Sequence, residues 1–444
     1  MKTSIKFINH ASVIVSGENI SVLSDPWYVG EVFHKGWNLL HETPNEDIKN
    51  FLKNITHIWI SHEHPDHFSI PFFKQFSENI KNNSIKIIFQ KTKDKRVYKF
   101  LVGLGLEVQE LEFNKKYNLS NNYSVTCIKD GFYDSGLLIE NCGEKILNLN
   151  DCEITTLNKA NEVYSITGKV NVLLTQFSFA AWKGGKENKK WRKEAAFEKI
   201  KTIHMQIEKF QPEYVIPFAS YIYFSNEENF YLNDAVNRPD QLKEKLRENA
   251  SKLIILSPND VFGGSHQSLN EKQALRFWSE KYEGIISKKL NRYSIIELEA
   301  LQHNFNSYCE RILKKNNILL IKVIRTLSPI SVFKPITIKL TDLDLCIKLD
   351  YVNKDLVKAV APAMLSMKSE SLDFIFKNSF GFDTLTVNGC FEEEQKGGFV
   401  KATNSLAIEN LNNLGIKIEL KTLFNFSIIK LFITRLYRVA RKLH

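Results

Sequence analysis

Short apolar runs alternate with longer amphipathic segments along roughly the first 285 residues, and polar turns separate them. Apolar runs of this length predict buried β-strands, and apolar positions at helical spacing predict helices. The strands are expected at Ser4–Ile8, Ser12–Val15, Ile20–Leu23, His57–Ile60, Ile85–Phe89, Ser124–Ile128, Leu137–Ile139, Lys145–Leu149, Val170–Thr175 and Tyr214–Ile216. The helices are expected at Ile70–Phe76, Lys95–Leu104, Ala195–Phe210, Gln241–Asn249 and Lys272–Tyr282. Such alternation is typical of an α/β domain.

The pattern changes near Glu283–Arg292, and residues 293–444 are expected to form a smaller α+β domain. A helix over Ile296–Ile312 precedes strands at Ile336–Leu340 and Leu343–Leu349, and Asn388-Gly389 suggests a hairpin. The chain closes on a basic amphipathic helix, Leu423–Leu443, in which Lys430 and Arg435 interrupt any run long enough to cross a bilayer. Packing of this helix on its own domain is favoured over peripheral membrane contact.

Composition indicates how large a core the chain can bury and in which cellular compartment it works. With 444 residues, 43% of them hydrophobic, the chain has material for two domains. The first fifteen residues hold no apolar stretch of signal-peptide length, since Asn9 and His10 interrupt it. The six cysteines form no C-x-x-C pair, which argues against a disulfide framework and against a thiolate metal site. We therefore expect a cytoplasmic protein.

The net charge of +10 is compatible with a nucleic acid, a membrane surface or an anionic small molecule as partner. One basic cluster spans Lys183–Lys193, but it lacks the composition of an RNA-binding motif, so no nucleic-acid partner is expected. Lys183 is a candidate for gripping an anionic small-molecule substrate, although a solvated run of charge is the favoured interpretation. Asn233 and Arg238 lie in a polar loop before a predicted helix and suit either substrate binding or a capped turn.

The strongest local signal is an H-x-H-x-D-H pattern directly after the predicted strand His57–Ile60. Its residues are His62-Glu63-His64-Pro65-Asp66-His67. Alternate histidines on an extended stretch point the same way, and the following turn brings Asp66 and His67 back toward them. We expect His62, His64, Asp66 and His67 to hold two adjacent metal ions.

A strand ending in this motif resembles the metallo-β-lactamase superfamily. The resemblance implies an αββα sandwich, with helices outside two packed sheets. Phe7–Ser12 and Leu23–Pro26 are similar to the opening of the lactonase-like branch, in which a histidine and an Asp-Pro pair lie near the metals. His10 is therefore a catalytic candidate together with Asp66.

A longer resemblance links residues 5–250 to the catalytic half of the CMP-N-acetylneuraminic acid hydroxylase family. It is carried by Asp130–Cys152, Ile216–Tyr221 and Asn233–Asp240. By this likeness Asp151 is the carboxylate that bridges the two metals. The family also contains a Rieske iron–sulfur domain, and this chain has no C-x-H and C-x-x-H pair. An oxygenase of this kind would need a separate electron-transfer protein.

Two departures from the superfamily bear on the metal. Its hydrolases present a histidine at the Asp130-Gly131 turn and another after a strand such as Tyr214–Ile216, where this chain has Asp130 and Ser220. The first metal could be completed by Asp130, or by the alternatives, which are Asp134, His34, His41 and His266. A ligand set rich in oxygen favours iron or manganese over zinc.

The expected function is a non-haem iron oxygenase that acts on an anionic, sugar- or nucleotide-like molecule. A metal-dependent hydrolase of lactonase or phosphodiesterase type is the alternative, in which Asp66 orients a metal-bound hydroxide. A metal-poor binding or scaffold protein is a third hypothesis, because two usual histidines are absent. In the C-terminal domain, the segment Ser369–Glu392, which contains Phe380–Leu385, is faintly similar to sterol-carrier-like folds. The likeness implies lipid binding or dimerisation, and plain structural support is the equal alternative.

Overall fold

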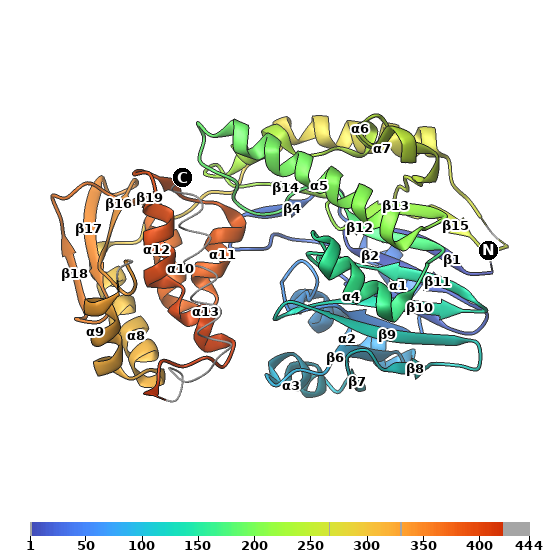
Figure 1. Ribbon diagram of the computed structural model, residues 1–444, viewed down its shortest axis with the longest axis horizontal. Helices are drawn as coiled ribbons and strands as arrows, with labels where there is room; N and C mark the ends of the chain where they lie inside the picture. Colours follow the sequence, from blue (N-terminus) through green and yellow to red (C-terminus); the bar gives the residue numbers. More distant parts are fainter. Residues whose placement is uncertain (1, 266, 329–330, 421–444) are drawn as a thin grey trace. The chain divides into compact units, whose positions relative to one another are not determined.

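The computed structural model describes residues 2–265, 267–328 and 331–420 (Figure 1). It divides into two compact units. Unit 1 comprises Met1–Lys183, Asn188–Ser225 and Phe230–Leu290. Unit 2 comprises the chain from Asn291 onward together with two short segments, Gly184–Glu187 and Asn226–Asn229. The predicted C-terminal helix at Leu423–Leu443 lies outside the described residues.

Unit 1 is built on two mixed sheets. The first has the order β15-β1-β2-β3-β5-β6-β7, formed by Val261–Gly263, Ser4–Asn9, Ser12–Ser16, Ser21–Ser24, His57–Ile60, Lys86–Gln90 and Val108–Leu111. The second has the order β13-β12-β11-β10-β9-β8, formed by Tyr214–Phe218, Val172–Gln176, Glu144–Asn148, Asp134–Asn141, Tyr123–Asp130 and Lys116–Asn118. A small antiparallel pair joins β4 (Trp37–Leu39) to β14 (Ile222–Phe224).

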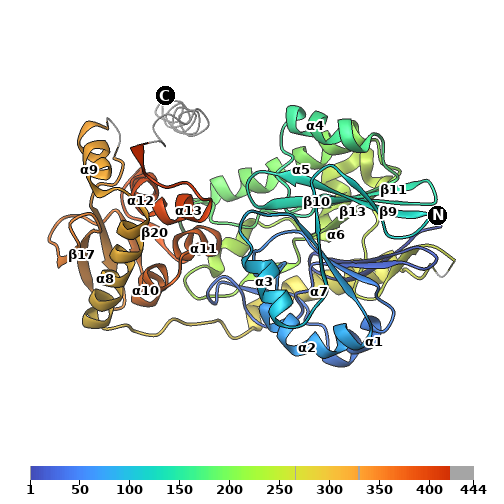
Figure 2. The ribbon, with the colours of Figure 1, turned by 90° about the horizontal axis from the view of Figure 1, so that it is seen from below.

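Helices cover the outer faces of both sheets. They are α1 (Asn45–Leu52), α2 (Ile70–Asn82), α3 (Arg96–Gly103), α4 (Leu157–Thr167), α5 (Lys189–Phe210), α6 (Pro239–Leu246) and α7 (Glu271–Glu283), with 3-10 turns at Phe230–Ala235, Arg247–Lys252 and Gly284–Ser287. Figure 2 shows α4 and α5 on one side of the sheets and α1, α2 and α3 on the other. The unit is thus the predicted αββα sandwich.

The apolar strand sequences follow from burial on both faces. In β5, Trp59 packs into the core between the two sheets, whereas Ile58 and Ile60 pack against α1, α2 and α3. In β12, Leu174 enters the same central core while Leu173 joins the layer beneath α4. Because successive side chains point to opposite faces, a strand covered on both sides needs a continuous apolar run.

Unit 2 has its own sheet and core. The sheet order is β18-β17-β16-β19-β20, formed by Asp355–Lys358, Leu345–Asp350, Ile336–Leu340, Leu365–Met367 and Glu392–Glu393. Its helices are α8 (Leu298–Lys315), α9 (Ile318–Leu327), α10 (Ser369–Lys377), α11 (Gly381–Asn388), α12 (Gly398–Leu406) and α13 (Ile408–Asn413). The rings of Phe305 and Phe376, 5.2 Å apart, pack α8 against α10.

The hairpin predicted at Asn388-Gly389 is wrong. Asn388 ends helix α11, and Gly389 follows it in the left-handed conformation with φ 69°. A glycine after a helix end satisfies the same conformational need as a glycine in a tight β-turn, so the dipeptide alone does not distinguish them. Short elements such as β4, β7 and α1 also escaped the sequence analysis, because three to eight residues carry little periodicity.

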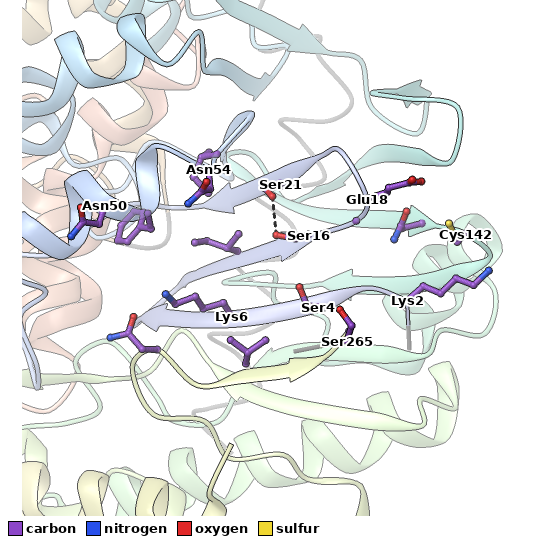
Figure 3. A pocket seen from close by; sticks show the side chains of 18 of the residues that line it. Lys2, Ser4, Lys6, Ser16, Glu18, Ser21, Asn50, Asn54, Cys142 and Ser265 are labelled. Carbon is purple, nitrogen blue, oxygen red and sulfur yellow. Dashed lines mark hydrogen bonds between the residues drawn. The ribbon is translucent and has the colours of Figure 1, made fainter. Parts of the chain in front are cut away.

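A hollow of about 970 Å³ lies on the outer face of β1, β2 and β15 (Figure 3). Ser4 and Lys6 point into it from alternate positions of β1, opposite the buried Ile5 and Phe7. Among the described residues that line it, none belongs to the histidine motif. A search of the described helices finds none with the length and hydropathy that crossing a bilayer requires.

His57, at the start of β5, predicts a pH dependence of stability. Burial and the nearby Lys86 lower the pKa of His57 from 6.5 to about 4. The unfolded chain therefore binds more protons between these two values, and stability falls as pH falls through that window. Relative to His57→Gln, the wild type should lose at most about 3 kcal/mol more between pH 7 and pH 4.

Urea unfolding followed by tryptophan fluorescence measures this, because the six tryptophans all lie in unit 1. His303→Gln, at an exposed position of unit 2, is the matched control and should track the wild type. Parallel pH curves for the wild type and His57→Gln would contradict the prediction.

Candidate metal centre

Strand direction brings the predicted ligands to one edge of the sandwich. β1, β3 and β5 run parallel, so the residues after them, His10, Asp25 and the histidine motif, meet at one end of the first sheet. In the second sheet, β11 ends just before Asp151, and the antiparallel β10 begins at Asp134 beside it. Ser135 Oγ donates to Ser61 O at 2.6 Å and joins the two edges.

Asp25 organises this edge from beneath. Its side chain is fully buried, and its carboxylate accepts hydrogen bonds from the Ser61 backbone N–H at 2.8 Å and from Ser61 Oγ at 2.9 Å. It also accepts from the Asn150 amide, and it lies 3.1 Å from His67 Nδ1. This last contact fixes His67 with Nδ1 protonated, which leaves Nε2 as the free metal-binding nitrogen.

Among the residues that the structure describes, three groups of side chains could each hold a metal ion. They are His62, His64 and Asp134; His62, His67 and Asp151; and His10, Asp66 and His67, with the ligand atoms of each group within 4.8 Å of one another. Because the middle group shares one histidine with each of the others, the groups form one continuous cluster. Two adjacent metals with Asp151 between them fit this arrangement.

The cluster's atoms are close enough to compete for the same protons. His62 Nε2 lies 2.9 Å from His64 Nδ1 and 3.5 Å from Asp134 Oδ1. His67 Nε2 lies 3.1 Å from Asp66 Oδ2 and 3.3 Å from Asp151 Oδ1, and His10 Nε2 lies 3.5 Å from Asp66 Oδ2. These short approaches between nitrogen and carboxylate atoms are those of ligands converging on a shared cation.

Burial and neighbouring charges shift the pKa values strongly in opposite directions. Burial, aided by the other histidines, holds the pKa of His62 well below its usual value. Burial opposes ionisation of Asp151, but His67 outweighs it and lowers the pKa of Asp151 to about 2. Burial raises the pKa of Asp134 to about 7, so its ionised form needs a cation beside it.

Unsatisfied buried atoms test whether these residues suit a metal. Both ring nitrogens of His10, Oδ1 of Asp66 and Nε2 of His67 are buried without a hydrogen-bond partner. Leaving such groups unpaired costs about 1–3 kcal/mol each. A bound cation would satisfy them together, and the residues therefore fit a metal centre.

The centre is closed on one side and open on the other. The Trp27 ring packs edge-on against His10 at 5.5 Å, and Phe33 does the same against His64 at 5.9 Å. By contrast, the side chains of Asp134 and Asp151 are 26% and 23% exposed. The centre is therefore open to solvent at these two carboxylates.

The two residues that stand where superfamily hydrolases have histidines do not enter the groups of described residues. Asp130 accepts from the Glu153 backbone at 2.6 Å and pairs with Lys159 at 2.8 Å, so its carboxylate serves the loop after β11. Asp134, four residues later, lies beside His62 instead. Ser220 accepts hydrogen bonds from the backbone of Phe177 and Ser178.

His10 lies beside the segment after β13, where superfamily hydrolases carry the second of the two histidines that this chain lacks. The Ala219 N–H donates to the His10 carbonyl at 2.7 Å, which links the end of β1 to the segment after β13. His10 joins Asp66 and His67 in the third group. The histidine chosen as a catalytic candidate thus sits among the possible metal ligands.

The remaining candidates lie elsewhere or serve the fold. His34 and His41 are in none of the three groups of described residues, and His266 lies outside the described residues. The side-chain amide of Asn233 forms hydrogen bonds with the backbone of Phe224 and Phe230. Arg238 contacts Asp240 at 3.3 Å and lies over the Tyr282 ring.

The sequence analysis missed two residues beside Asp151. Gln176, at the end of β12, donates from its amide to Asp151 Oδ1 and accepts from Lys199 Nζ at 2.6 Å. Lys183, the predicted substrate-binding lysine, lies near enough for its charge to act on Lys199. The one local signal for Gln176 was its position, because it is a polar residue at the end of a buried apolar strand.

No protein-family model matches the chain. The mouse CMP-N-acetylneuraminic acid hydroxylase is 28% identical over 275 residues, which cover 58% of this chain and 46% of that protein. The zebrafish enzyme is 26% identical over 57% of this chain and 44% of its own length. The human protein, described as inactive, is 26% identical over 58% of this chain and 53% of its own length. The match spans about half the length of these relatives.

Replacing Asp25 should weaken metal binding without abolishing the fold. In Asp25→Asn the side chain no longer bears the charge that orients His67, and loss of such a contact typically costs 10–100-fold in metal affinity. Titration of the metal-free protein with Co²⁺, followed by visible absorption, measures this. Asp47→Asn, at an exposed position of α1, is the control. Unchanged Co²⁺ affinity in Asp25→Asn would contradict the role given to Asp25.

Solved structures with similar architecture include CmlA, a diiron β-hydroxylase from Streptomyces venezuelae, at 14% identity and TM-score 0.43 over 59% of this chain and 54% of that chain. The metallo hydrolase Igni18 from Ignicoccus hospitalis has 16% identity and TM-score 0.41 over 59% of this chain and 98% of its own. These scores do not separate hydroxylase from hydrolase. From its histidine motif, its sandwich topology and its curated relatives, the chain is a protein of the metallo-β-lactamase fold whose N-terminal unit resembles part of the CMP-N-acetylneuraminic acid hydroxylases.

Proposed function

We propose that the protein is a non-haem iron oxygenase that hydroxylates an anionic, sugar- or nucleotide-like small molecule. The observation that carries the proposal is Asp134, a carboxylate beside His62 and His64 where a hydrolase would supply imidazole. With Asp66 and Asp151 it brings three carboxylates to the centre beside the four imidazoles of the groups, and a carboxylate in place of an imidazole moves the preference from zinc toward iron or manganese. The likeness to the hydroxylases supports the same choice.

His62, His64 and Asp134 would hold one metal, and His10, Asp66 and His67 the other, with Asp151 between them. Two iron ions held in this way would supply the redox chemistry of oxygen activation. Asp25 keeps His67 in the tautomer that binds metal, and the rings of Trp27 and Phe33 restrict water on the closed side. Separate catalytic roles for Asp66 and His10 stay predictions.

The substrate would enter over Asp134 and Asp151, whose side chains form the exposed rim. Lys183, whose charge acts on Lys199 behind Asp151, is the candidate for binding a carboxylate or phosphate group of the substrate. Hydroxylation of a C–H bond places one oxygen atom of O₂ in the product and reduces the other to water, with two electrons and two protons. A separate electron-transfer protein would supply the electrons, since the sequence has no Rieske motif.

Elemental analysis of protein purified without oxygen tests the metal, and it should find iron in excess of zinc. The purified protein should then hydroxylate CMP-N-acetylneuraminic acid or a related sugar nucleotide in the presence of a chemical reductant. Mass spectrometry after reaction under isotopically labelled O₂ should find the label in the product. Equal turnover with and without oxygen, or cleavage of a lactone or phosphodiester by a zinc form, would overturn the proposal in favour of a hydrolase.

A single substitution tests the ligand that carries the argument. Asp134→His replaces an oxygen donor by imidazole and should raise the ratio of zinc to iron in protein grown with both metals. Asp130→His makes the same chemical change four residues earlier, at a carboxylate already paired with Lys159, and should leave the ratio unchanged. If the zinc-to-iron ratio changes in Asp130→His but not in Asp134→His, then residue 130 rather than residue 134 is the ligand, and the proposal is contradicted.

A further inference from the structure

A chain of two hydrogen bonds runs from Asp151 to helix α5. Gln176 Nε2 donates to Asp151 Oδ1, and Lys199 Nζ donates to Gln176 Oε1 at 2.6 Å. Gln176 is 9% exposed, and Lys199 is partly buried. Gln176 contacts the candidate ligand Asp151 directly and Lys199 contacts Gln176, so the two residues lie one and two contacts behind the centre.

The lysine decides which way the amide of Gln176 points. An ammonium group can only donate hydrogen bonds, so Lys199 must face the amide oxygen. The amide nitrogen is then turned toward Asp151, where it donates to a carboxylate. In the reversed orientation the amide oxygen would face Asp151, and two acceptors would repel each other.

Burial lowers the pKa of Lys199, while the carboxylates of Asp151 and Glu153 oppose that shift and favour the ammonium. Lys199 is thus linked to Asp151 through the neutral amide of Gln176, two hydrogen bonds away.

Asp151 gains from such support because its side chain is only partly enclosed by its neighbours. It follows Asn150, a residue with left-handed φ of 49°, in the loop after β11, and its side chain is 23% exposed. Its Oδ1 is the atom that approaches His67 Nε2 at 3.3 Å. A donor on the same oxygen fixes the direction of the remaining lone pairs, which a metal between His62 and His67 would use.

We propose that Gln176 and Lys199 are positioning residues of the metal centre, in which Lys199 orients the amide of Gln176 and this amide holds Asp151 in the direction required between two metals. The inference rests on the proposed metal centre but not on iron or on hydroxylation. It predicts that metal affinity depends on a lysine with no metal contact of its own.

Titration of metal-free protein with Co²⁺ tests the proposal, with visible absorption reporting both affinity and coordination. Lys199→Met and Gln176→Leu should each weaken Co²⁺ binding by about tenfold, the lower end of the range for such supporting contacts. The double variant should bind no more weakly than Gln176→Leu, because the two residues act through one contact. Lys199→Arg, which restores a donor-only cation, should recover most of the affinity.

Lys201→Met is the matched control, since this lysine lies on the same helix, is 55% exposed and pairs with Glu198. Wild-type affinity in Lys199→Met, or additive losses in the double variant, would overturn the inference. If Gln176→Leu does not fold, Lys199→Met and Lys199→Arg decide the question together. Absence of Co²⁺ binding by the wild type would instead refute the metal centre itself, so the two failures are distinguishable.

Discussion

The carboxylate of Asp25 is the constraint on which the candidate centre depends. It lies at the end of β3 with no exposed surface, and it binds Ser61 after β5 and Asn150 after β11. One buried anion thus fixes strand ends from both sheets. Its contact with His67 also sets which imidazole nitrogen is available. A buried charge is tolerated only when it is paired and hydrogen-bonded, so these contacts must form together.

Backbone strain is concentrated at the edge that bears the candidate metal ligands. His10, Asp25, Asn150 and Ala219 have positive φ angles of 27°, 36°, 49° and 51°. Each follows a strand at the ligand-bearing edge, and such conformations persist only where surrounding contacts enforce them. The central core between the sheets supplies that rigidity, since the strands leading to these residues are buried. The site's geometry therefore rests on the sandwich as a whole.

The basic character of the chain has a different meaning in the folded protein. Arg192, from the Lys183–Lys193 cluster, is 1% exposed and forms a two-pronged ion pair with Asp234 at 2.8 and 2.9 Å. Lys189 lies 3.5 Å from the same carboxylate. These two members of the cluster therefore stabilise the start of α5. Lys199, outside the cluster and not singled out from the sequence, is the cation with a hydrogen-bonded connection to the centre.

The sequence by itself determined the sandwich and the histidine motif of the candidate site, because both depend on local patterns of residues. Strands buried on two faces need continuous apolar runs, and the histidine motif is six consecutive residues. Only the tertiary structure placed Asp134 rather than Asp130 beside His62, since the two are cross-strand partners and β10, not β9, lies next to the strand that leads to Asp151. It alone brought Gln176 and Lys199 to Asp151, because strand order sets proximity between distant positions and no local pattern encodes it.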